Sequence, residues 1–188
     1  LSLDTERDAV AAMSRLAVER PEVGREFPLD EALGWLRYRE ERFAEAGAHH
    51  ERYAEGKKNP VLAASGHLSA AAAWLEAQDL ERAERAAREV RAVAARLRHP
   101  YLEARAERIL RAVAYRRGTA TKTDRELVAA IHELGHPHLE ALVALNEAAI
   151  AWRAGDLPEA RALSTLAADL WERTGNAAAA PLAAALGW

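Results

Sequence analysis

The sequence predicts an all-α protein, and three observations support that class. Half of the 188 residues are hydrophobic, yet only 6% are aromatic, and alanine supplies much of the rest. Small side chains at that density suit helices whose backbones pack closely. Segments of β-branched or aromatic residues with period-two alternation are scarce, so strands have little support. Runs of helix-forming sequence are instead broken at near-constant intervals by Gly, Asn, His or Pro.

The breaks belong to an internal repeat. Residues 97–104 (LRHPYLEA) and 134–141 (LGHPHLEA) align without gaps at an offset of 37 residues and share the pattern L-x-H-P-x-L-E-A. Asn59-Pro60 marks a weaker member one period upstream, and residues 174–176 (TGN) mark a break one period downstream. Such a period is typical of helix–turn–helix units that bury their apolar faces by stacking on one another.

Each repeat contains a second break, which predicts two helices per unit. In Gly155-Asp156-Leu157-Pro158, the glycine suits the left-handed residue after a helix, the aspartate can cap the next helix, and proline is tolerated in its first turn. Residues 73–83 repeat this arrangement with Gln78-Asp79. The expected helices, in chain order, cover residues 4–20, 29–56, 61–77, 80–97, 101–117, 122–134, 138–154, 157–173 and 177–186.

Residues 145–160 (LNEAAIAWRAGDLPEA) resemble a unit of the tetratricopeptide (TPR) repeat family. That family favours Leu-Asn before a small residue, then an aromatic, here Trp152, and then Gly-Asp-x-x-Glu-Ala. Residues 71–83 fit similarly, with Trp74 as the aromatic. Glu147 is a departure, because leucine is usual at its position. The resemblance covers roughly residues 60–176, and the spacing resembles the longer TPR subclass of bacterial regulators and scaffold proteins.

The resemblance implies a right-handed α-solenoid of antiparallel helical hairpins, about four hairpins with a C-terminal capping helix. As one domain, 1–188, it would comprise a divergent N-terminal pair (1–58), three repeats (59–98, 99–135 and 136–175) and a cap (176–188). The family implies a scaffold or adaptor that binds a peptide or partner domain in a concave groove, without turnover or cofactor. The alternative is a regulatory or sensor domain of a larger bacterial signalling or transcription protein. The predicted partner-binding residues are Asn146, Arg105, Arg108 and His67.

The charge distribution bears on the partner. A net charge of −3 argues against general attraction to nucleic acid. Residues 81–125 nevertheless carry thirteen basic and six acidic side chains, a net charge of +7. Arg105, Arg108 and Arg111 recur every three residues, which predicts a stripe that could face an acidic partner. The favoured interpretation is a solvated helix face with i,i+4 ion pairs such as Glu81–Arg85.

The motif HELGH at residues 132–136 matches the helical zinc signature H-E-x-x-H. The ligand set it suggests is His132, His136 and Glu147, with Glu133 as general base, and Glu140 and His138 nearby. Pro137 argues against it, because the residue before a proline is pushed out of the helical region. The same His-Pro pair recurs at His99 without a partner histidine. We therefore expect the end of a helix here, no metal and no catalysis.

The tryptophans divide into two groups. Trp74 and Trp152 occupy matched places near the ends of first helices, which predicts core packing for both. Trp171 falls in an apolar helical stripe and is also expected in the core. Trp35 and Tyr38 are candidates for an exposed patch.

Compartment and targeting signals are few. The chain has no cysteine, the N-terminus lacks a basic segment followed by an apolar run, and no apolar stretch is long enough to span a membrane. The sequence therefore predicts a cytoplasmic protein with no membrane partner.

Overall fold

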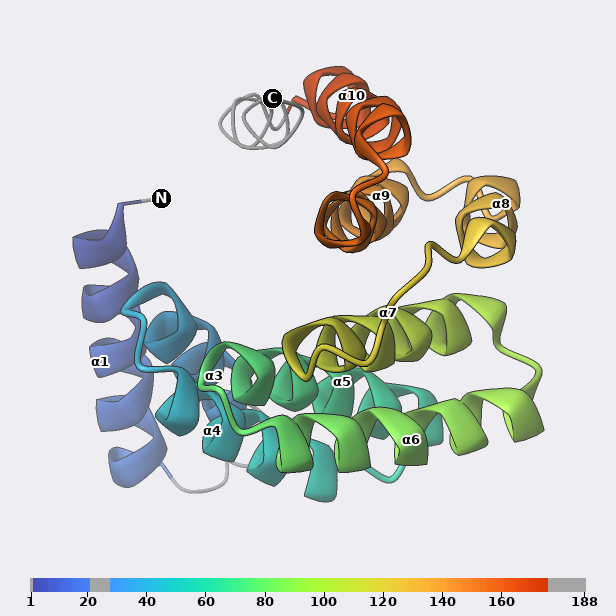
Figure 1. Cartoon of the computed structure of the whole chain (residues 1–188). Coiled ribbons are helices and arrows are strands. Elements are labelled where there is room, and N and C mark those ends of the chain that lie inside the picture. Colours follow the sequence, from blue (N-terminus) through green and yellow to red (C-terminus); the bar gives the residue numbers. More distant parts are fainter. Residues whose placement is uncertain (1, 21–27, 176–188) are drawn as a thin grey trace. The chain divides into compact units, whose positions relative to one another are not determined.

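All regular structure in the described part of the chain is helical, which confirms the all-α class (Figure 1). The computed structural model describes residues 2–20 and 28–175. The expected helix at 177–186 and the cap at 176–188 lie outside these residues. The helices are α1 (Leu3–Glu19), α3 (Leu29–Arg39), α4 (Phe43–Glu55), α5 (Pro60–Glu76), α6 (Leu80–Leu97), α7 (Pro100–Arg116), α8 (Arg125–Glu133), α9 (Pro137–Ala154) and α10 (Leu157–Arg173).

The chain forms two compact units, Leu1–Leu102 and Glu103–Trp188, which are described separately. In the first unit α3 packs on α1 and α4, and α5 packs between α4 and α6. In the second unit α9 packs along α10, and the short helix α8 packs on α9 (Figure 1). Consecutive helices are therefore the packing partners in both units, so local chain connections set the contacts.

Asparagine and aspartate side chains begin several of the helices. Asp79, Asp124 and Asp156 each accept a hydrogen bond from the backbone N–H three residues later, at 3.0, 2.9 and 3.2 Å. These bonds satisfy N–H groups that have no partner within the helix. Gly155 has a φ of 81°, and Gln78 takes the same left-handed conformation at 63°. The turn chemistry predicted for both breaks is confirmed.

The single helix expected over residues 29–56 is wrong, because α3 and α4 are separate. The chain turns at Glu41, whose φ of 59° lies in the left-handed region. The carboxylate of Glu40 accepts hydrogen bonds from Arg7 and Arg37, both at 2.6 Å, and these contacts hold the turn. No glycine or proline marks this break in the sequence, so propensity alone predicts a continuous helix. The expected helix 122–134 is also shorter, since α8 begins only after the Asp124 cap.

Small residues let the helices of the first unit approach closely. A Cβ atom at Gly47 would lie 2.6 Å from the ring of Trp74, and one at Gly34 would lie 2.6 Å from the ring of His50. Trp74 is buried, and its indole N–H donates to the carboxylate of Glu51 at 2.9 Å. The prediction that Trp74 packs in the core is confirmed. Glycine at these positions is a packing requirement, because any side chain would overlap an aromatic ring.

The core of the second unit lies between α9 and α10. Trp171 is buried there, as predicted. The cluster comprises Ala141, Ala144, Ala148, Leu163, Ala167, Leu170 and Trp171. The same prediction for Trp152 is wrong, since Trp152 is 49% exposed. The preceding residue, Ala151, is buried instead. Consecutive side chains of a helix point about 100° apart, so Trp152 points away from the direction in which Ala151 is buried. Trp74 is buried because α5 packs against both α4 and α6, which cover more of its surface.

None of the helices in the described residues is long and apolar enough to cross a membrane.

Candidate functional site

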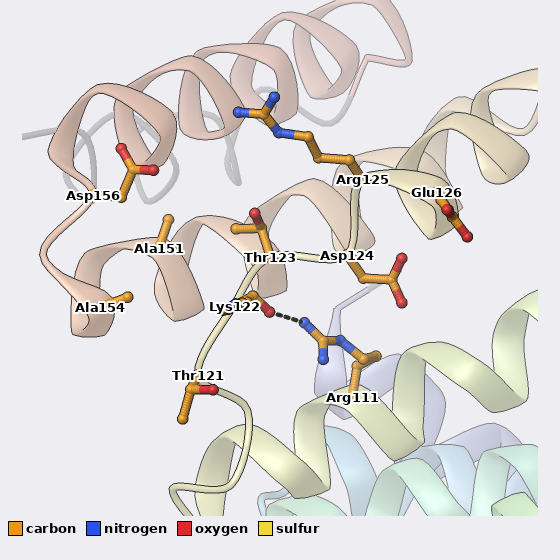
Figure 2. A pocket seen from close by; sticks show the side chains of 10 residues that line it. All are labelled: Arg111, Thr121, Lys122, Thr123, Asp124, Arg125, Glu126, Ala151, Ala154 and Asp156. Carbon is orange, nitrogen blue, oxygen red and sulfur yellow. Dashed lines mark hydrogen bonds between the residues drawn. The ribbon is translucent and has the colours of Figure 1, made fainter.

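The loop between α7 and α8 is held in place by a buried carboxylate of α9. Glu147 is fully buried and accepts hydrogen bonds from Nε and Nη2 of Arg111 at 2.8 and 2.7 Å. It also accepts one from the backbone N–H of Asp124 at 2.7 Å. Nη2 of Arg111 donates in turn to the carbonyl oxygen of Lys122 at 2.8 Å (Figure 2). One ion pair therefore fastens α7, the loop and α9 together.

Both partners of the Arg111–Glu147 pair are charged, which strengthens the hydrogen bonds between them. The hydrogen bond to Glu147 is the largest influence on Arg111 and raises the pKa of its guanidinium, while burial opposes it. Glu147 stands where the TPR pattern has leucine, and Arg111 lies 36 residues earlier, about one repeat away. Glu147 in place of leucine was the feature of the sequence that could have indicated this contact. Sequence reasoning missed its meaning, because it placed Arg111 in a stripe that faces solvent or, as the alternative, an acidic partner.

A cleft of about 600 Å³ opens beside this loop and is called the loop cleft here. Figure 2 shows its lining side chains, which come from α7, the loop, the start of α8, the end of α9 and the α9–α10 turn. They are Arg111, Thr121, Lys122, Thr123, Asp124, Arg125, Glu126, Ala151, Ala154 and Asp156. Three basic groups face three acidic ones, and Arg111 is already paired with Glu147. The cleft therefore offers no net positive charge to a phosphate or another anion.

A second cavity, of about 470 Å³, lies between α8 and α10 and is called the α8–α10 groove. It is lined by Thr123, Arg125, Val128, Ala129, His132, Glu133, Glu140, Glu159, Leu163 and Leu166. At one end Nε and Nη2 of Arg125 donate to the two carboxylate oxygens of Glu159, both at 2.9 Å. At the other end Nδ1 of His132 lies 2.8 Å from a carboxylate oxygen of Glu140. Aliphatic side chains form the stretch between these two polar ends.

The predicted partner-binding residues fall in both units. In the second unit the side-chain amide of Asn146 donates to the carbonyl oxygen of Arg108 at 3.5 Å, so the structure brings these two residues together. Arg105 and Arg108 are half-buried and already interact within the chain. His67 is half-buried on α5 of the first unit. None of the four lines the loop cleft or the α8–α10 groove.

The HELGH motif spans the end of one helix and the start of the next. α8 ends at Glu133, Gly135 has a φ of 66°, and His136 occupies the position before the first residue of α9, Pro137. The predicted break before Pro137 is confirmed, and His99 takes the same place before α7. His132 and His136 therefore lie on no common helix face.

Two other groups of the rejected zinc set are bound to different residues. Glu147 is bound by Arg111, and His132 pairs with Glu140. Glu133 is exposed at the end of α8. In residues 2–20 and 28–175, no group of three or more His, Cys, Asp or Glu side chains is arranged to hold a metal ion.

Comparison with known proteins informs the fold alone. No protein-family model matches the sequence. No curated protein matches it. The structure is similar to the crystal structure of BtubC (BKLC) from P. vanneervenii, with a TM-score of 0.59 and 14% sequence identity. The match covers 98% of this chain and 87% of that chain. A likeness at this identity supports the all-helical fold and carries no information on activity.

Proposed function

We propose that this chain is a protein-interaction module of the TPR-like α-solenoid type, which binds a peptide or partner domain without chemical turnover. The recurrence of helix pairs supports the architecture. α5 with α6 and α9 with α10 are packed pairs that each fill one interval of the sequence repeat, and α7 with α8 fills the interval between them in the sequence. Stacked pairs of this kind present extended surfaces that other proteins can occupy.

The α8–α10 groove is the observation that carries the proposal. It is open, and it combines an aliphatic floor with a polar group at each end. Binding sites for other molecules generally combine apolar contact area with a few polar groups that fix orientation. The exposed side chains of Trp152 and Leu157 add apolar surface at the α9–α10 turn. Tryptophan is enriched among the residues that dominate binding energy at protein interfaces.

The acidic side chains buried in the second unit favour recognition over catalysis. Glu147 receives hydrogen bonds from Arg111 and from the Asp124 backbone, and Glu140 lies against His132. A general base needs a carboxylate that can reach a substrate proton. These two carboxylates are engaged in holding α7, α8 and α9 together, so their role is structural.

The test is retention of a partner that leaves the protein unchanged. The purified chain would be immobilised and exposed to an extract of the cells that make it, and retained proteins would be identified by mass spectrometry. We expect at least one purified partner to bind in solution with defined stoichiometry by calorimetry, and to keep its mass after prolonged incubation. A partner that is cleaved or modified, or no partner that binds in solution, would contradict the proposal.

A further inference from the structure

We propose that the α8–α10 groove binds a segment of a partner protein that carries aliphatic side chains next to a lysine or arginine. The inference rests on the proposed function and deepens it, because it names the surface and the chemistry of the ligand.

The groove has an apolar middle. On α8, Val128 and Ala129 line it, and on α10 Leu163 and Leu166 face it. Val128 and Leu166 are only partly buried, and both pack against the core between α9 and α10. The floor of the groove is thus continuous with the hydrophobic core. An aliphatic side chain placed there would extend that core and remove further apolar surface from water.

The volume is suited to a peptide segment. About 470 Å³ accommodates more than one aliphatic side chain and lies within the usual range of ligand-binding cavities. α8 is short and packs mainly on α9 rather than on α10, which leaves the space between α8 and α10 open. The occupant is therefore expected to contact both helices at once.

The charges differ between the two ends of the groove. At one end Arg125 is paired with Glu159 through two hydrogen bonds, so that end is neutral. At the other end Glu140 lies 2.8 Å from Nδ1 of His132, which leaves Glu133 as the carboxylate of that end without a close partner among the lining residues. Glu133 is exposed and has no ion-pair partner within the described residues. This end attracts a cation.

Helix geometry adds to the same preference. Glu133 is the last residue of α8. The C-terminus of a helix carries partial negative charge from its unpaired carbonyl groups, which favours a lysine or arginine nearby. An occupant with a basic residue beside its aliphatic side chains matches both the floor and the acidic end, whereas an acidic segment would be repelled there.

Selection of peptides by the intact chain tests the inference. Random twelve-residue peptides displayed on phage would be selected against the immobilised full chain, and enriched peptides would be synthesised and measured by fluorescence anisotropy. We expect the enriched sequences to combine aliphatic residues with lysine or arginine. Replacing the basic residue by glutamate should weaken binding at least about tenfold.

Three variants locate the site. Ala129→Lys places a cation at an exposed position in the middle of the groove, one helical turn before Glu133, and Glu133→Lys reverses the charge at its acidic end. Each should weaken the selected peptides at least about tenfold. Glu126→Lys is the matched control, because Glu126 is exposed on the same helix but lines the loop cleft instead. Helical content measured by circular dichroism should be unchanged in all three, since each position is exposed.

The outcomes separate this inference from the proposed function. If selected peptides, or a partner retained from cell extract, bind Ala129→Lys and Glu133→Lys as tightly as the original chain, the groove is the wrong surface and the interaction function stands. Enrichment of acidic peptides, or of none, also overturns the inference. Failure to retain any partner from extract contradicts the proposed function itself.

Discussion

Substitution of Glu147 by leucine tests whether the buried ion pair stabilises the second unit. Leucine is the residue that the TPR pattern has at this position and is close to glutamate in size. The substitution removes both hydrogen bonds from Arg111 and the one from the Asp124 backbone. It leaves the Arg111 guanidinium, whose side chain is 18% exposed, without its carboxylate. The pair of charges would become one poorly solvated cation.

The expected loss in free energy of unfolding is about 3 kcal/mol. Breaking a buried ion pair by removing one partner costs roughly 3–5 kcal/mol, and the partial exposure of Arg111 places this case at the low end. The double variant Arg111→Met with Glu147→Leu should recover most of the loss, because a matched apolar pair leaves no charge uncompensated. The backbone N–H of Asp124 would remain unpaired, at a cost of about 1 kcal/mol, and the carbonyl oxygen of Lys122 would lose its hydrogen bond from Arg111.

Urea unfolding followed by circular dichroism measures these differences. Glu126→Gln is the control, because Glu126 is exposed and should change stability by less than about 0.5 kcal/mol. A loss below about 1 kcal/mol for Glu147→Leu would refute the reasoning. So would a double variant no more stable than the single one, since the penalty would then not come from the unpaired arginine.

Two further predictions concern the first unit. Gly47→Ala should lower the free energy of unfolding by about 1–3 kcal/mol, because its Cβ would lie 2.6 Å from the Trp74 ring. Gly56→Ala meets only backbone atoms at 3.6 Å and should not destabilise the chain, and equal losses in urea unfolding would contradict the packing argument. Burial lowers the pKa of His50 from 6.5 to about 4, with a smaller effect of neighbouring His49. The contribution of neutral His50 to the free energy of unfolding should therefore be fully present above about pH 6.5. It should fall by about 3 kcal/mol as pH drops towards 4, because His50 takes up a proton in the unfolded chain before it does so in the folded one. His50→Phe should remove this dependence, and an unchanged acid slope in urea unfolding would refute it.

The sequence was informative wherever a local rule decides the outcome. Asp156 after Gly155, and Asp79 after Gln78, predicted helix starts that the structure has. Pro137 predicted the break that divides HELGH between two helices. In each case the deciding interaction lies within a few residues along the chain, so the residue types carry the information. The turn at Glu41 was missed because it depends on contacts of Glu40 with Arg7 and Arg37, one of them from α1.

The candidate site was much less predictable. The groove requires α8 and α10 to face each other, and no rule along the chain states which residues of α8 will meet Leu163 and Leu166. Asn146 and Arg108 were proposed as partner-binding residues through the resemblance, and the structure shows a contact between them within the fold. His132 and Glu140 were both considered as metal ligands, and the structure pairs them with each other.

The sequence by itself determined that the protein is helical, where most helices begin and end, and the period at which helix pairs recur. These properties follow from propensity, capping and turn chemistry, which act between near neighbours. The tertiary structure alone decided that Trp74 is buried while Trp152 is exposed, and that Glu147 binds Arg111 36 residues away. Burial and ion pairing depend on which helix faces which, and that arrangement results from packing over the whole unit.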